Sequence, residues 1–161
     1  MRETDGKVNI ICVDDQREVL SAVLKDLSSL AVAFHIEDCE SADEALDLID
    51  ELDAEGEHVA LIISDHVMPE KTGVELLTEV SLDPRFRFTR KVLLTGQATH
   101  ADTIEAINNA SIERYFEKPW DAEALLSAAK KLVTQYVFDA GLDYRDFPDV
   151  LDTQVVLDRL K

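Results

Sequence analysis

The chain has 161 residues, a length that suits a single domain, and 46% of them are hydrophobic, as in ordinary globular proteins. Its 34 Asp and Glu residues outnumber the 16 Lys and Arg residues, which gives a formal net charge of −18. A polyanion of this size is repelled by nucleic acid and by anionic membranes, so we expect no direct binding of this chain to either.

The composition also argues against a membrane or an oxidised location. No stretch has the roughly 20 apolar residues of a membrane helix, and the amino end lacks the apolar run of a signal peptide. Two cysteines occur, Cys12 and Cys39, each in a strand-like segment, which favours buried free thiols over a disulfide or redox site. We therefore expect a cytoplasmic protein.

Strand-like and helix-like segments alternate from residue 8 onward. Val8 to Val13 is short, rich in β-branched residues and followed by acids, which predicts a strand. Residues 17–30 repeat apolar side chains at the 3.6-residue period of a helix, and Ala31 to Ile36 has the composition of a second strand. A capping box, Ser41 with Glu44, then predicts the start of a second helix.

The same alternation continues to residue 137. Val59 to Ser64 is a continuous apolar run, typical of a strand covered on both faces. A second capping box at Thr72 starts a third helix. The remaining elements are a strand at Lys91 to Thr95, a helix at Thr99 to Ala110, a short strand at Ile112 to Phe116 and a regular helix at Asp121 to Val137. Five strand–helix units in succession predict an α/β fold with a parallel sheet and helices on both faces.

Residues 138–161 leave this alternation. Gly141 and Pro148 interrupt the segment, and Asp152 with Thr153 predicts a short capped helix that ends at Leu160. We therefore assign the domain to residues 7–137. The segment 138–161 is either a packed tail or the start of a linker to a further domain.

Chemically active residues follow four of the five predicted strands. They are Asp14 and Asp15 after the first strand, Asp65 after the third, Thr95 at the end of the fourth and Lys118 after the fifth. Functional groups of such sheets gather at the carboxyl ends of the strands, so we expect these five side chains to meet. A lone acid at such a position would be read as part of a solvated loop. Five matched groups at one sheet edge favour a site.

Three clustered carboxylates repel one another and need a proton or a cation. Oxygen ligands with few other donors suit Mg²⁺, which takes one or two carboxylates and then a phosphate group. With the charge neutralised, Asp65 can act as a nucleophile toward a phosphoryl group. Lys118 offers a positive charge to the phosphoryl oxygens, and Thr95 offers a hydroxyl donor.

The chain resembles the receiver domain of two-component response regulators over about residues 7–137. The motifs that carry the resemblance are Val13-Asp14-Asp15, Ser64-Asp65-His66-Val67-Met68-Pro69 followed by Gly73, Leu94-Thr95-Gly96 and Glu117-Lys118-Pro119. The resemblance implies a doubly wound, flavodoxin-like sheet of five strands in the order 2-1-3-4-5.

The resemblance also implies the roles of the site residues. Asp65 takes a phosphoryl group from a sensor histidine kinase or a phosphotransfer protein. Mg²⁺ is held by Asp14, Asp15, Asp65 and the backbone carbonyl of Val67, with Asp15 as a direct ligand and Asp14 acting through water. The Lys118–Pro119 bond is expected to be cis. The chain is not an enzyme in the usual sense, because it catalyses only its own phosphorylation and dephosphorylation.

A switch is the last implication of the resemblance. Thr95 would move to bond the phosphoryl group, and Tyr115 would turn inward to fill the space; otherwise Tyr115 is a half-buried strand residue without a signalling role. The face formed by residues 99–137 would then control a partner protein, an attached output domain or a homodimer. The apolar Val67 orients no water, so with Gln97 it predicts a fairly long-lived phosphate.

Some features depart from the family or leave alternatives. The interval between Asp15 and Asp65 is longer than in the shortest members, and we place the surplus in a solvated loop over Asp50 to Glu57. A dehalogenase-type phosphatase needs a second Asp two residues after an Asp on the first strand, and Asp14-Asp15-Gln16 does not match. A receiver-like module that binds partners without phosphorylation remains the alternative.

Overall fold

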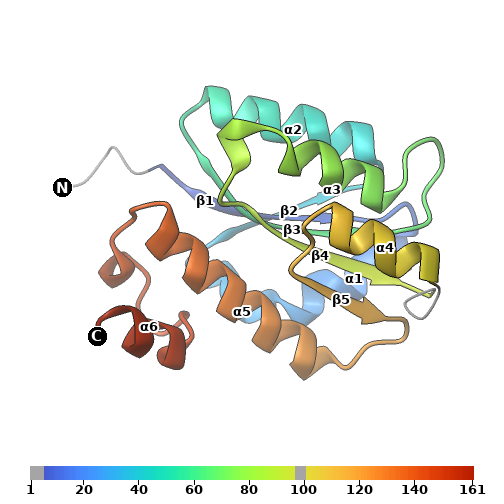
Figure 1. The fold of residues 1–161 in the computed structure, drawn as a ribbon. Coiled ribbons are helices and arrows are strands. Elements are labelled where there is room, and N and C mark those ends of the chain that lie inside the picture. The colour runs from blue at the N-terminus through green and yellow to red at the C-terminus, as the bar shows by residue number, and fades with distance from the viewer. Residues whose placement is uncertain (1–5, 97–100) are drawn as a thin grey trace.

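The computed structural model describes residues 6–96 and 101–161 (Figure 1). Within these residues, five parallel strands form one sheet in the order β2-β1-β3-β4-β5. The strands are β1 (Val8–Val13), β2 (His35–Cys39), β3 (His58–Asp65), β4 (Arg90–Thr95) and β5 (Arg114–Glu117). The predicted doubly wound parallel sheet is confirmed.

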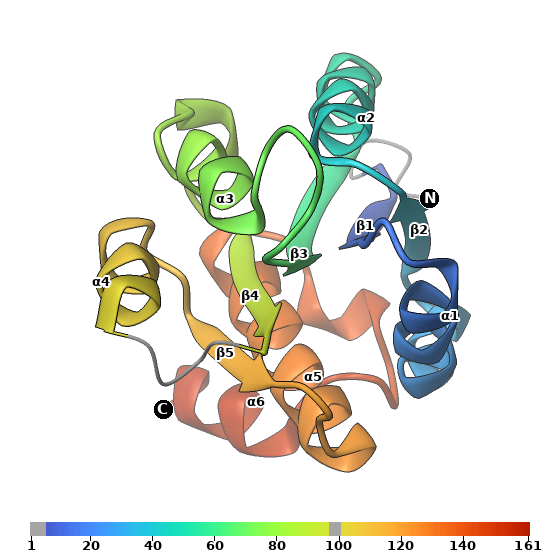
Figure 2. The ribbon, with the colours of Figure 1, turned by 90° about the vertical axis from the view of Figure 1, so that its right-hand side faces the viewer.

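Helices cover both faces of this sheet. They are α1 (Arg17–Asp26), α2 (Ala42–Ala54), α3 (Gly73–Ser81), α4 (Ala101–Asn109), α5 (Ala122–Asp139) and α6 (Thr153–Arg159). Figure 2 looks along the sheet and shows α1 and α5 on one face, with α2, α3 and α4 on the other. In the part of the chain that the structure describes, no helix is long and apolar enough to cross a lipid bilayer.

Alternating side chains of each central strand divide the core into two layers. In β1, Ile10 and Cys12 pack toward α1 and α5, whereas Ile11 and Val13 pack toward α2 and α3. Burial on both faces explains why β3 is a nearly continuous apolar run and why most residues of β1 and the centre of β4 are apolar. Cys12 and Cys39 are both free and buried, as predicted.

The second strand was predicted four residues too early. Ala31 and Val32 belong to a 3-10 helix that follows α1, and Val32 is 82% exposed. β2 begins only at His35 and lies at the edge of the sheet, where most of its side chains are half-buried or exposed. An edge strand needs no continuous apolar run, so the apolar residues just before β2 misled the prediction.

The loop predicted at Asp50 to Glu57 was also wrong. α2 continues through Ala54, and Leu52 is buried on its inner face. Gly56 follows the helix with a φ of 77°, a left-handed conformation that glycine adopts without steric cost at a helix end. Most of the segment predicted as a loop is therefore helical. The first helix differs in the opposite way, because α1 ends at Asp26, short of Leu30.

The fourth helix is described from Ala101 to Asn109. Its predicted start at Thr99 lies outside the described residues, as do Gln97 and His100.

Residues 138–161 pack against the end of α5 (Figure 1). The ring of Phe147 stacks on Phe34 with 5.2 Å between centroids. The backbone N–H of Asp152 donates to Thr134 Oγ1 of α5 over 2.8 Å. α6 begins at Thr153 with Asp152 as its cap, as predicted, and it buries Val155.

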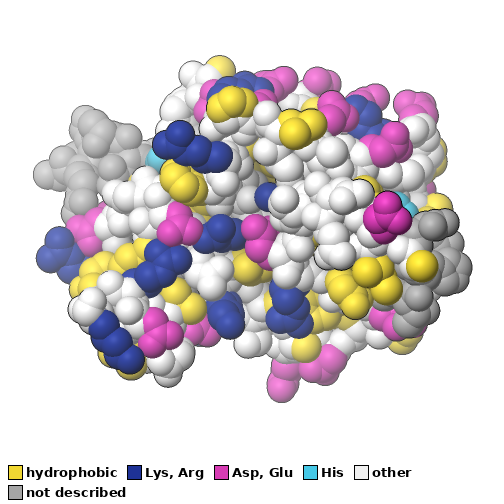
Figure 3. Space-filling model, viewed as in Figure 1, with side chains coloured by type: hydrophobic (Ala, Val, Ile, Leu, Met, Phe, Trp, Pro, Cys, Tyr) yellow, Lys and Arg dark blue, Asp and Glu magenta, His cyan; other side chains and the backbone are white. Residues whose placement is uncertain are grey.

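Charge is unevenly distributed between the two halves of the chain. Residues 85–161 hold 11 of the 16 Lys and Arg residues but 12 of the 34 Asp and Glu residues. In Figure 3, Lys and Arg side chains are therefore frequent over α5 and α6, whereas Asp and Glu side chains gather along α2 and α3. Because the order of the sheet follows the halves of the sequence, the excess negative charge lies on the β2-β1-β3 side.

Candidate functional site

The structure brings the five predicted residues to the carboxyl edge of the sheet. Asp14 and Asp15 follow β1, Asp65 and Thr95 end β3 and β4, and Lys118 follows β5. Beside them lies an open cavity of about 470 Å³, whose lining includes Asp15, Asp65, Val67 and Lys118. Thr95 is buried, with 1% of its surface exposed. The strand-end rule therefore predicted the position of these five residues at one sheet edge correctly.

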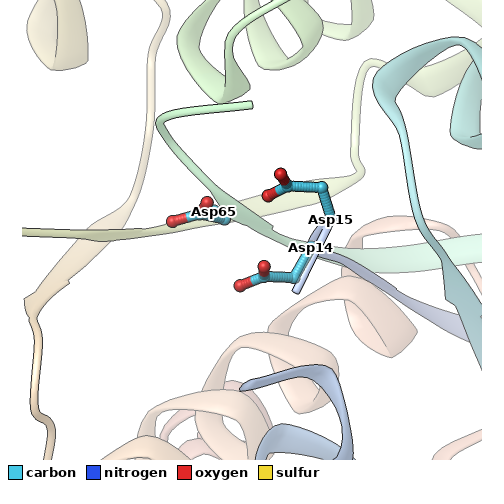
Figure 4. Close-up of side chains that lie close together, drawn as sticks. All are labelled: Asp14, Asp15 and Asp65. Atoms are coloured by element: carbon cyan, nitrogen blue, oxygen red, sulfur yellow. The ribbon is translucent and has the colours of Figure 1, made fainter. Parts of the chain in front are cut away.

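Three carboxylates lie close together at this edge of the sheet (Figure 4). One oxygen from each of Asp14, Asp15 and Asp65 lies within 4.8 Å of the others. Asp14 is 1% exposed and Asp65 is 5% exposed, whereas Asp15 is open to solvent. Burial raises the pKa of Asp14, and the charges of Asp65 and Asp15 raise it further, against the N–H of Gln16 and the ammonium of Lys118. The cluster is therefore short of positive charge.

Lys118 supplies part of that charge. Its Nζ lies 2.5 Å from Asp65 Oδ1 and 3.7 Å from Asp14 Oδ2. Its backbone N–H donates to the carbonyl of Thr95 over 3.0 Å, which fixes the start of the loop beside β4. The following peptide bond, Lys118–Pro119, is cis, as the resemblance implied.

Close backbone contacts hold the segment around Asp65. The hydroxyl of Ser64 donates to the Asp65 carbonyl over 2.9 Å, and the Gly73 N–H donates to the His66 carbonyl over 2.8 Å. A Cβ atom on Gly73 would lie 2.1 Å from the Asp65 carbonyl oxygen, so only glycine fits there. Thr72 begins α3 with the predicted capping box.

The site has the donors that a divalent cation needs. Asp14 Oδ2 is buried and has no hydrogen-bond partner among the residues that the structure describes. Carboxylate oxygens from two strands with no His or Cys in the group match the preference of Mg²⁺ for hard oxygen ligands. The residues present therefore fit Mg²⁺.

Two features of the site were not predicted. The backbone N–H of Gln16 donates to Asp14 Oδ1 over 2.8 Å, an Asx turn that the Asp14-Asp15-Gln16 sequence could have indicated. The indole N–H of Trp120, two residues after Lys118, donates to Asp26 Oδ2 over 2.8 Å. No local pattern indicates this second contact, because the two residues lie 94 positions apart.

The side chain of Tyr115 is exposed to solvent. It lies on β5 opposite Leu93 and is 43% exposed. His66 is half-buried directly after Asp65. Neither side chain is part of the cluster formed by Asp14, Asp15 and Asp65.

Comparison with known proteins gives one consistent family. The profile described as "Response regulator receiver domain" matches residues 10–130. The hydrogenase transcriptional regulatory protein HoxA of Cupriavidus necator is 29% identical over 130 residues, which cover 81% of this chain and 25% of that protein. The chemotaxis protein CheY1 of Helicobacter pylori is 27% identical over 118 residues, which cover 73% of this chain and 90% of that protein.

Solved structures with a similar fold include receiver domains. The signal receiver domain of an HD domain-containing protein from Pseudomonas fluorescens Pf-5 superposes with a TM-score of 0.72 at 28% identity, covering 88% of this chain and 96% of that one. A structure titled as the adenylate cyclase from Rhodopirellula baltica has a TM-score of 0.69 at 25% identity, covering 84% and 93%. The chain spans about a quarter of the length of the two hydrogenase regulators that it matches.

Proposed function

Because the chain belongs to the response regulator receiver domain family, we propose that it accepts a phosphoryl group on Asp65 and acts as a switch in two-component signal transduction. The observation that carries this proposal is the position of Asp65. Its carboxylate is 2.5 Å from the Lys118 ammonium and lies close to two further carboxylates. A nucleophile, a cation for the phosphoryl oxygens and a set of oxygen ligands are thus adjacent.

Asp14, Asp15 and Asp65 would hold Mg²⁺ together with the backbone carbonyl of Val67. Support comes from the orphaned Asp14 Oδ2 and from the oxygen-only donor set. When bound, Mg²⁺ neutralises carboxylate charge and orients the phosphoryl oxygens. Val67 lines the same cavity.

The transfer itself is a substitution at phosphorus. An oxygen of the Asp65 carboxylate forms the new bond to phosphorus while the phosphorus–nitrogen bond of a donor phosphohistidine breaks. The departing imidazole nitrogen keeps the electron pair and takes a proton. Lys118 is already beside Asp65, so its ammonium can pair with the phosphoryl oxygens with little movement.

Phosphorylation of Asp65 would then change the surface of the protein away from Asp65. The phosphoryl group adds about −1.5 to −2 charges and three acceptor oxygens, which attract the Thr95 hydroxyl. The outward Tyr115 can then turn toward the vacated space, changing the face formed by residues 99–137. We propose a histidine kinase or phosphotransfer protein as the donor in the cytoplasm. A partner protein or an attached output domain is the target.

The test is incubation of the chain with Mg²⁺ and acetyl phosphate, followed by intact-mass measurement. We expect the mass of one phosphoryl group to appear on the wild-type chain and on Asp47→Asn, an exposed acid of α2. The variant Asp65→Asn should gain none, because an amide is not a nucleophile toward phosphorus. An unmodified wild type, with Mg²⁺ bound or not, would leave the phosphorylation-independent binding module as the better description.

A further inference from the structure

A hydrogen bond connects the loop after Lys118 to the far end of α1. The indole Nε1 of Trp120 lies 2.8 Å from Asp26 Oδ2. The Trp120 ring is half-buried and packs against the core layer that α1 and α5 share. Figure 2 shows these two helices on the same face of the sheet. The contact therefore joins two segments that both begin at the candidate site.

α1 is held at both of its ends by these contacts. Its N-cap residue, Gln16, donates its backbone N–H to Asp14 Oδ1 over 2.8 Å. Its last residue, Asp26, accepts from Trp120. With 10 residues, the helix is about 15 Å long, so Asp26 lies well away from the carboxylates. The acidic pair and the lysine loop are consequently braced against one helix.

The placement of Asp26 is unfavourable for the helix alone. A negative charge in the last turn faces the negative end of the helix dipole, so it does not stabilise α1. A half-buried indole N–H, by contrast, needs an acceptor. Asp26 therefore accepts the hydrogen bond of Trp120 although its charge does not stabilise α1.

That loop is the part of the fold that carries Lys118. On one side, the Lys118 backbone N–H is fixed to the Thr95 carbonyl. On the other side, Trp120 is separated from Lys118 by one proline. A shift of Trp120 would therefore move the ammonium relative to Asp65.

We propose that the Trp120–Asp26 hydrogen bond positions Lys118 for phosphoryl transfer, with Asp26 as a remote positioning residue. This inference rests on the proposed phosphorylation of Asp65. The Mg²⁺ ligands are not part of the loop, so loss of the bond should slow phosphoryl transfer without weakening Mg²⁺ binding.

A purely structural role for Trp120 makes a different prediction. Trp120 precedes Asp121, the N-cap of α5, and from that position a large apolar side chain packs on the first turn of a helix. Trp120→Phe keeps an aromatic ring in this position, although a smaller one, and removes the N–H donor. Asp26→Asn keeps an acceptor oxygen for the indole, whereas Asp26→Leu removes it.

The experiment measures the rate of phosphoryl uptake from acetyl phosphate at saturating Mg²⁺, with Mg²⁺ affinity measured separately by calorimetry. We expect Asp26→Leu and Trp120→Phe each to be slowed roughly tenfold, since misplacing a catalytic group by about 1 Å can cost about 100-fold. Their double variant should be no slower than either single variant, because both remove the same bond. Asp26→Asn and the exposed-acid control Asp47→Leu should react like the wild type.

Each other result contradicts the inference in a recognisable way. If the wild type is phosphorylated and Asp26→Leu is equally fast, the positioning role alone is wrong. If Mg²⁺ affinity falls in parallel with the rate, or if the losses in the double variant add, the pair only supports the fold. If the wild type takes up no phosphoryl group, the proposed function is wrong and the positioning role is wrong with it.

Discussion

Asp65 and Asp14 are buried carboxylates that share one nearby ammonium. Lys118 lies within 4 Å of both, and it remains only partly buried. Burying charges without partners costs free energy. Without Mg²⁺, the Lys118 ammonium reduces this cost by pairing with both carboxylates. The same ammonium competes with any cation for the three carboxylates. We therefore expect Lys118 to have opposite effects on phosphoryl binding and on metal binding.

Replacing Lys118 with Met should separate these effects. We expect Lys118→Met to lose phosphoryl uptake and to bind Mg²⁺ roughly tenfold more tightly, about 1.4 kcal/mol, because a competing positive charge is gone. Calorimetric titration with Mg²⁺ and intact-mass analysis measure the two quantities. The matched control is Lys131→Met, an exposed lysine of α5. Unchanged or weaker Mg²⁺ binding in Lys118→Met would contradict the competition.

At the scale of elements, one carboxylate links α5 to both β4 and α6. Asp139, the last residue of α5, pairs with Arg90 at the start of β4 and with Arg159 of α6, the latter over 2.8 Å. Burial acts to raise the pKa of Asp139, but the hydrogen bonds and charges of Arg159 and Arg90 outweigh it, so the pKa is lowered. Ionised Asp139 thus stabilises the folded state.

This gives a stability prediction with a defined pH dependence. We expect Asp139→Asn to lower the free energy of unfolding at neutral pH by about 2 kcal/mol, a typical value for hydrogen bonds to charged groups. A lowered folded pKa makes this contribution present above the unfolded value of about 3.9 and lost as pH falls through the folded pKa. The wild type and the variant should therefore converge in acid.

Urea unfolding at neutral pH and at several acidic pH values measures this difference. The exposed Asp158→Asn, also on the α6 side, serves as the control and should change stability little. A difference that persists unchanged below the folded pKa would show that the loss in Asp139→Asn does not come from the ionised carboxylate.

The elements also show what can be predicted from the sequence. β1, β3 and β4 were located within a residue or two because strands buried on both faces are mostly apolar. β2 was misplaced because an edge strand lacks that pattern, and the end of α2 was taken for a loop because its charges outweigh the single buried Leu52. The five site residues followed from topology. The contacts of Trp120 and Asp139 could not be predicted, because each joins residues brought together only by tertiary packing.

At the scale of the whole molecule, we propose that residues 138–161 form part of the same folded unit as residues 7–137. Phe147 stacks on Phe34, and Val150 and Val155 are 4% and 7% exposed. A flexible linker would not bury such side chains. The segment covers the end of α5, far along the chain from Asp65.

Shortening the chain tests this assignment. Ending it after Val137 should lower the free energy of unfolding by at least about 3 kcal/mol, because burying each large apolar side chain contributes about 1.5–3 kcal/mol. Phosphoryl uptake by the fraction that remains folded should persist. Ending the chain after Arg159 removes two exposed residues and should change little. Equal stability of the shorter chain and the full one would identify 138–161 as a linker.

The uneven charge of the two halves has a consequence for how partners arrive. A molecule that is strongly negative on its β2-β1-β3 side and nearly balanced on its β4-β5 side carries a permanent electric moment across the sheet. A basic surface approaching from solution would turn the chain before touching it, so that the acidic side leads. An acidic surface would meet the opposite side. Salt at physiological strength confines this orienting field to about 8 Å, so the selection of a face takes place in the last step of the encounter.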